Sequence, residues 1–433
     1  MRLFHRIVSF LILSQFCEGG HFDQPSTEIP RNELNKLRAD LTTTLNVLKN
    51  VAKNPIDVLN GGMKPIKDIV KPISYRMKYK LPKNDASLTG LMDKISEQLD
   101  IILQQVNNES WIVHYGELQN FYAISYGFIN GYRTIFYQQW HQSSVDRMYS
   151  EIGQPGNDFT VPLTTLATYL ADSSVVPNAM DKFYYSYKSF DEFQRSIARS
   201  ALFYAIAAET TSFMTGLGFS DVIEEKLHSI RQAIKRFPQV YYKNVVKGIT
   251  RKIKFIIDKE SRETEFTWKT VAESLQTFRH NGDEAVLFAE EYNNPLETYG
   301  VFMWPENCTI LSQNITSNID QNATVTFPGS SSTEINSYRG LNFMIHRSSP
   351  KNEKAKKAKE VFDTSRVLLE RFMLRNSKAD ELVETINMYY KFPLVAVFIV
   401  AEPCGFSVDF PLLKKADSKG KGKLEITYVL FGY

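Results

Sequence analysis

The sequence predicts an α+β protein: a mainly α-helical bundle with a buried central helix, followed by a smaller C-terminal α/β domain. Three observations lead to this prediction. Apolar residues recur at helical spacing through residues 30–281. After its first residue, the segment 199–219 carries a single charge, Glu209, so other helices could enclose it. Residues 282–433 change to short β-branched and aromatic runs, which are typical of strands.

Residues 1–19 are predicted to be a secretory signal peptide. Arg2 and Arg6 form a basic start, and the apolar run 7–16 is about half the length that spans a bilayer, which is about 20 residues. A buried N-terminal helix is the alternative. We expect a secreted protein whose residues 20–29 are a polar, flexible leader.

Four Asn-x-Ser/Thr sequons fit secretion, because this motif accepts N-glycans in secreted proteins. They begin at Asn108, Asn307, Asn314 and Asn322. The last three lie in a polar stretch, 307–324, that reads as an exposed loop; an ordinary Asn/Thr-rich loop without glycans is the alternative. Cys308 and Cys404 remain after the signal peptide, and in an oxidising compartment they predict one disulfide, with two separate buried thiols as the alternative.

The first predicted helices are delimited by proline and glycine. Pro30 opens a helix that Asn54-Pro55 ends. A short helix follows Gly61-Gly62, and Pro65 and Pro72 are expected to limit its length.

Residues 87–107 form the most regular predicted helix, with Ser87 as its N-cap. Its apolar seam suits packing against another long helix and consists of Leu88, Met92, Ile95, Leu99, Ile102 and Val106. Residues 111–149 then form an aromatic helical region, for which we expect core packing, with a sugar- or lipid-binding face as the alternative.

The apolar segment 199–219 is expected to lie inside a longer helix. Residues 162–172 form a short helix before it, and Ser189 and Glu192 resemble a capping box for a helix that begins near Phe190. Its Glu209 is expected to lie on an exposed polar edge with Ser212 and neighbouring threonines. The alternative is a buried carboxylate, whose pKa would be raised by burial.

Further helices and strands complete the prediction. Helices are expected at 221–237, which Pro238 ends, and at 239–257, 263–280, 351–374 and 380–390. Strands are expected at 285–289, 299–304, 341–346, 394–401, 406–410 and 424–431. The continuous apolar run 394–401 predicts a central strand covered on both faces.

The search for chemistry finds no catalytic motif. The histidines are scattered, with no pair at i and i+4, and no nucleophile elbow or phosphate loop is present. We therefore expect no enzyme, no metal and no cofactor, although an enzyme without a recognisable motif is an alternative. The formal net charge of +3 excludes the basic signature of a nucleic-acid-binding protein.

Lysines cluster at 351–359, including Lys354, Lys356 and Lys357, and again at 414–423. Such runs are usually solvated surface, and a minority bind anionic membranes or glycans. With Glu209, these three lysines are the candidate electrostatic residues.

Residues 30–280 resemble the helical bundles of secreted α-helical pore-forming and latrotoxin-type proteins. The resemblance rests on the helix 88–106 with its apolar seam, an aromatic helix and the nearly uncharged 199–219 helix. The chain also resembles an uncharacterised family of secreted animal proteins. Two functions follow as expectations. The first is a secreted glycoprotein that acts by binding a partner not identified by the sequence. The second, implied by the resemblance, is a membrane-active protein that inserts residues 199–219.

Overall fold

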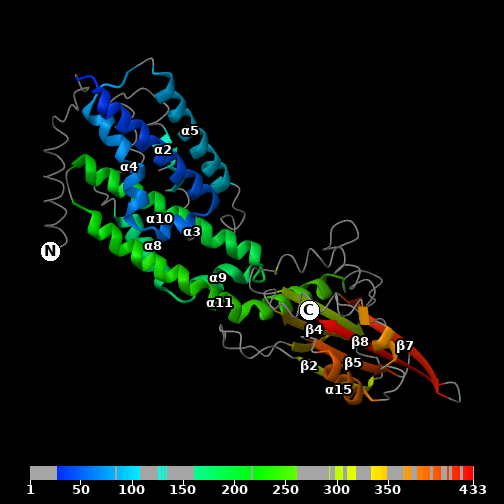
Figure 1. The fold of residues 1–433 in the computed structure, drawn as a ribbon. Coiled ribbons are helices and arrows are strands. Elements are labelled where there is room, and N and C mark those ends of the chain that lie inside the picture. Colours follow the sequence, from blue (N-terminus) through cyan, green and yellow to red (C-terminus); the bar gives the residue numbers. More distant parts are fainter. Residues whose placement is uncertain are drawn as a thin grey trace, which may run out of the picture. The chain divides into compact units, whose positions relative to one another are not determined.

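The computed structural model describes much of the chain, and it is mainly α-helical there, as predicted (Figure 1). The described residues are 27–82, 85–107, 125–127, 129–130, 132–133, 160–215, 218–260, 292, 298–305, 310–317, 333–348, 364–365, 367–371, 378–390, 394–400, 407–408, 412–419 and 423–432. The chain divides into two compact units. The first is Met1–Ala179 with Ser189–Pro238, and the second is Met180–Lys188 with Gln239–Tyr433. The expected domain boundary near residue 281 lies outside the described residues and stays a prediction.

Helices make up most of the described part of the first unit and also occur in the second. They are α2 (Arg31–Lys53), α3 (Pro55–Asn60), α4 (Met63–Lys78), α5 (Ala86–Asn107), α8 (Val161–Ala171), α9 (Val175–Asp181), α10 (Tyr187–Thr215), α11 (Ser220–Glu260) and α15 (Ala379–Tyr389). Pro30 precedes α2, and Asn54-Pro55 separates α2 from α3, as predicted. Outside the described residues lie most of the aromatic region 111–149, the predicted helix 263–280 and most of that at 351–374.

In the first unit, α2 packs against both α4 and α5 (Figure 1). The predicted seam of α5 is buried at most of its positions, including Ile95, Leu99 and Ile102. On α2, Leu37, Leu41 and Leu48 are fully buried. Each such leucine contributes about 1.5–3 kcal/mol when it leaves water, so apolar burial holds these helices together.

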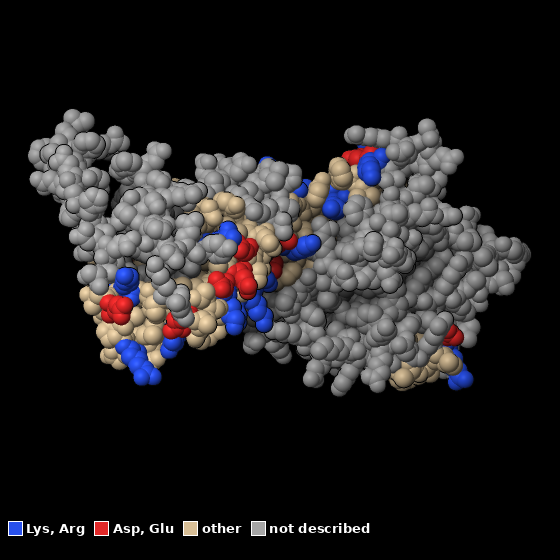
Figure 2. All heavy atoms as spheres, turned by 90° about the horizontal axis from the view of Figure 1, so that it is seen from above, with Lys and Arg blue, Asp and Glu red and all other residues tan. Residues whose placement is uncertain are grey.

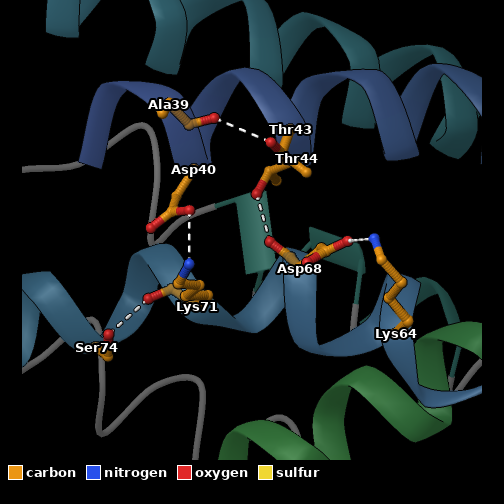
Figure 3. A network of polar contacts seen from close by, with 8 residues as sticks. All are labelled: Ala39, Asp40, Thr43, Thr44, Lys64, Asp68, Lys71 and Ser74. Carbon is orange, nitrogen blue, oxygen red and sulfur yellow. Dashed lines mark hydrogen bonds and ion pairs between the residues drawn. The ribbon is translucent and has the colours of Figure 1, made fainter. Parts of the chain in front are cut away.

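A polar network also joins α2 to α4 (Figure 3). The fully buried Thr44 donates its hydroxyl proton to the backbone oxygen of Asp68 at 2.8 Å. The Lys71 ammonium pairs with Asp40 at 2.8 Å, and Lys64 pairs with the Asp68 carboxylate at 2.9 Å. The ion pairs are partly exposed and contribute little, about 0–1 kcal/mol each, whereas the Thr44 bond satisfies a buried hydroxyl.

Two helices pass through prolines that were expected to limit them. Pro72 lies inside α4, and Pro238 lies inside α11, which is one helix where two were predicted. A proline removes one backbone hydrogen bond from a helix and kinks it. Both helices nevertheless continue because apolar residues are buried on either side of each proline, with Phe237 and Tyr241 flanking Pro238.

Two predicted helix starts are also wrong. The Leu88 amide at the start of α5 donates to the carboxylate of Asp85 at 3.0 Å, so Asp85 caps the helix and Ser87 lies inside it. The helix α10 begins at Tyr187, so Ser189 is helical rather than an N-cap. The helix α5 thus begins at Ala86, one residue before the predicted cap, and α10 begins three residues before Phe190.

The apolar middle of α10 is enclosed within the first unit. Every residue from Ala201 to Ala208 is buried, and the Phe193 ring packs against Phe237 at 5.6 Å between centroids. The expected polar edge is wrong at its threonines and serine, because Thr210, Thr211 and Ser212 are buried. The two threonine hydroxyls donate to backbone oxygens four residues earlier, which lets them be buried without water. The helix emerges at Phe213, whose side chain is 42% exposed.

The strands of the second unit form two four-stranded sheets. The strands are β1 (Thr298–Pro305), β2 (Ile310–Ser317), β3 (Thr333–Tyr338), β4 (Leu341–Ser348), β5 (Leu394–Val400), β6 (Ser407–Val408), β7 (Leu412–Lys419) and β8 (Lys423–Gly432). Their orders are β3-β4-β1-β6 and β2-β5-β8-β7, and every described pairing is antiparallel. As predicted from its apolar run, β5 lies inside its sheet, between β2 and β8, and α15 packs on β2 and β5.

The prediction that residues 307–324 form an exposed loop is wrong for the part of this range that the structure describes. Residues 310–317 form β2, which pairs with β5 from Ile310↔Val400 to Ser317↔Leu394. Polar residues disfavour a strand locally, but a position at the sheet edge tolerates them, and the apolar β5 supplies the pairing partner.

Candidate binding surface on the second half of α11

The residues singled out from the sequence do not converge in the described part of the chain. Asn314 lies in β2, and Glu209 lies in α10, where the Ser220 hydroxyl donates to both carboxylate oxygens at 2.9 and 3.2 Å. The other candidates lie outside the described residues and stay predictions: Asn108, Asn307, Asn322, Cys308, Cys404, Lys354, Lys356 and Lys357.

Two kinds of site are absent from the described residues. No group of three or more His, Cys, Asp or Glu side chains there could hold a metal ion. Within the same residues, no helix has the length and apolar character needed to cross a membrane.

A distinct surface lies on the second half of α11, within the second unit. One face of this helix is buried through Tyr241, Val245, Ile249, Ile253 and Ile256. The opposite face carries four cations, which we call the basic row: Lys243, Lys247, Arg251 and Lys254. Their spacing of four, four and three residues places them on one side of the helix over about 16 Å.

The four cations differ in how they are neutralised. The Arg251 guanidinium pairs with Asp181 at 2.6 Å, and the Lys254 ammonium lies 5.2 Å from the centre of the Tyr338 ring. Lys243 and Lys247 are exposed, and no described residue forms an ion pair with them. The charges of Lys243 and Lys247 therefore face solvent. For Arg251, the hydrogen bond to Asp181 raises the pKa of the guanidinium, so this residue stays positively charged.

An aromatic pair adjoins the row. Phe255 on α11 is 52% exposed, and its ring lies 5.9 Å from that of Tyr184. The Lys252 ammonium stands 5.2 Å from the centre of the Tyr184 ring, within the range of a cation–π interaction. An exposed phenyl ring beside several cations is suited to contact a partner that offers both acidic and apolar groups.

The position of Tyr184 depends on an uncommon backbone conformation. Tyr184 and Tyr185 both have positive φ, at 51° and 60°, which bulky residues rarely adopt. Gly248 permits this turn to approach α11, because its missing side chain leaves room for the Tyr184 backbone. Tyr185 is buried against Tyr241 at 6.4 Å between ring centroids, and this burial raises the pKa of its phenol.

The end of α11 is fixed to the β3–β4 hairpin. The Tyr338 hydroxyl donates to the Asp258 carboxylate at 3.0 Å, and the Arg339 guanidinium pairs with it at 2.8 Å. Arg339 and Gly340 both have positive φ, which gives the tight turn that two-residue hairpins favour. These contacts hold Lys254 and its neighbours in a defined place.

The sequence predicted a helix over residues 239–257, but it did not predict this surface. The missing signal was tertiary, because the contact of Tyr184 with Phe255 joins residues 71 positions apart in the chain. On the face shown in Figure 2, the described basic and acidic side chains are intermingled.

Comparison of the chain with known protein families, curated proteins and solved structures finds no match among any of the three.

Proposed function

We propose that this chain is a secreted glycoprotein, built as a helical bundle around α10 with a smaller second domain, that acts by binding rather than by catalysis. We further propose that an anionic partner binds through the basic row and the Tyr184–Phe255 pair. The observation that carries this proposal is the exposure of Lys243 and Lys247, one helical turn apart, on the same helix as the Phe255 ring, which is 52% exposed.

The charge arrangement supports an anionic partner. Two exposed lysines without an ion-pair partner among the described residues leave a local positive potential, which attracts anions and accelerates their association. Near an anionic surface each such lysine contributes about 1 kcal/mol. Arg251, although paired with Asp181, extends the row by one more turn.

The proposal is tested by binding to a soluble polyanion, for which dextran sulfate is a suitable probe. The double variant Lys243→Glu/Lys247→Glu should weaken binding at least about tenfold, because 1.4 kcal/mol corresponds to a factor of ten. Lys49→Glu/Lys53→Glu is the matched control, with the same charge change at the same spacing on exposed positions of α2. Equal effects of the two double variants would contradict a specific surface and indicate attraction by net charge.

The membrane-active alternative receives less support from the described contacts. Insertion of residues 199–219 would remove the buried run Ala201–Ala208 from the core of the first unit. It would also expose the buried threonines Thr210 and Thr211. A protein that acts by binding requires no such rearrangement.

A further inference from the structure

A second feature lies in the first unit and shares no residue with the α11 surface. It is an open groove of about 550 Å³ between α2 and the beginning of α5. This volume is within the range of small-molecule sites, which is about 300–1,000 Å³. The groove is lined by Arg38, Ala39, Thr42, Ala86, Ser87, Gly90, Leu91 and Lys94.

Small residues create the space in the groove. Ala39 on α2 and Ala86, Ser87 and Gly90 on α5 contribute little side-chain volume. A Cβ added at Gly90 would find no atom within 4 Å, so the groove is empty at this position. A larger residue at Gly90 would fill it without displacing a neighbour.

The groove offers hydrogen-bond donors and positive charge. Arg38 and Lys94 line it, and none of the described lining residues is acidic. One terminal nitrogen of Arg38 donates to Asn35 at 3.2 Å and the other pairs with Asp85, whereas its Nε–H is buried and has no hydrogen-bond partner among the described residues. Lys94 is exposed, and no described residue pairs with it. Two cations among the lining residues favour a ligand with acceptor oxygens, because hydrogen bonds between charged groups are stronger than neutral ones.

The carboxylate that pairs with Arg38 does not cancel this preference. Asp85 accepts the Leu88 amide at 3.0 Å and the Arg38 guanidinium, and these bonds, the amide first, lower the pKa of its carboxyl group. The Asp85 carboxylate therefore already binds two groups, the backbone amide at the start of α5 and one terminal nitrogen of Arg38. The Lys94 ammonium and the Ser87 hydroxyl remain as donors toward the groove.

We propose that this groove binds a small organic anion, one that presents carboxylate or phosphate oxygens to the Arg38 guanidinium, Lys94 and Ser87. The small lining residues leave room for a short carbon skeleton beside the acidic group. Binding here is independent of the polyanion contact proposed for α11.

The test uses isothermal titration of the full mature protein with inorganic phosphate and with succinate, against sodium chloride at equal ionic strength. We expect saturable binding of at least one of the two anions. Gly90→Leu should weaken it at least about tenfold by filling the groove, which corresponds to about 1.4 kcal/mol. Gly90→Ala is the control, because a methyl group leaves most of the groove open.

Two further variants secure the interpretation. Lys94→Gln should also weaken binding, whereas Lys243→Glu/Lys247→Glu should leave it unchanged, which separates this site from the α11 surface. Circular dichroism would show whether each variant is folded. If Gly90→Leu does not fold, Lys94→Gln provides the test, because it changes an exposed side chain. The proposal is overturned if neither anion binds saturably, or if Lys94→Gln and every folded groove-filling variant bind as the wild type does.

Discussion

Gly248 of α11 lies directly against Tyr184: a Cβ added to the glycine would stand 2.2 Å from the carbonyl oxygen of the tyrosine. No real Cβ contact is so short, and the obstructing atom belongs to the backbone, which cannot rotate away. The close approach positions the aromatic pair Tyr184–Phe255 beside the basic row. Gly248 is thus a structural requirement of the candidate binding surface.

Gly248→Ala is therefore expected to destabilise the protein. Overpacking of this kind costs about 1–3 kcal/mol and here meets backbone rather than a flexible side chain, so the upper part of that range is expected. Urea denaturation would measure the loss. Gly218→Ala is the control, because a Cβ there has no neighbour within 4 Å. An unchanged midpoint for Gly248→Ala would refute the close packing of Tyr184 on α11.

The cap of α5 gives a prediction that depends on pH. Asp85→Ala should lower stability at neutral pH, whereas Ser87→Ala should not, because only Asp85 accepts the Leu88 amide. Hydrogen bonding lowers the pKa of Asp85 in the folded state. Its stabilisation is thus present above the unfolded carboxyl pKa of about 3.9 and is lost as pH falls through the lower folded value.

The measurement is the urea midpoint of wild type, Asp85→Ala and Ser87→Ala as a function of pH. The difference between wild type and Asp85→Ala should shrink as the solution is acidified below about pH 4. A difference that grows on acidification, or an equal loss in Ser87→Ala, would show that Asp85 is not the cap.

The enclosure of α10 predicts slow hydrogen exchange. The amides of Ala201–Ala208 are buried, so they should exchange only through global unfolding of the first unit. Mass spectrometry of exchanged peptides would measure their protection. Liposome leakage between about pH 5 and 8, a range in which histidine charge changes, should be absent. Leakage accompanied by rapid exchange of this run would instead support the membrane-active alternative.

The helices were largely predictable, because their apolar periodicity records which face is buried. The seam of α5 and the apolar middle of α10 are examples, with Leu99 and Ala205 fully buried. The wrong predictions concern prolines that were expected to end a helix. Pro72 and Pro238 remain inside helices because tertiary packing outweighs one lost hydrogen bond, and no local pattern reports that balance.

The strands were less predictable from the sequence than the helices. The three strands that were missed, β2, β3 and β7, all lie at sheet edges. Edge strands carry polar residues and lysine, so their sequences resemble loops until the partner strand is known. The run Lys414–Lys415 in β7 was read as part of a basic surface cluster, and it pairs with Thr427 and Tyr428 of β8.

The candidate binding surface was predictable only in part. The basic row follows from helical spacing, but the positive φ of Tyr184 and Tyr185 has no signature in these two residue types. The role of Gly248 could be found only from the structure, because a glycine inside a helix more often signals weak helix propensity than close packing.

The salt dependence of polyanion binding tests the central proposal most directly. The dissociation constant for dextran sulfate would be measured between about 50 and 200 mM salt, for wild type and for Lys243→Glu/Lys247→Glu. Each lysine that displaces a counterion contributes roughly one unit to the slope of log Kd against log salt. The double variant should therefore bind more weakly, with a slope lower by about two. An unchanged slope and affinity would contradict the proposal that α11 forms the binding surface.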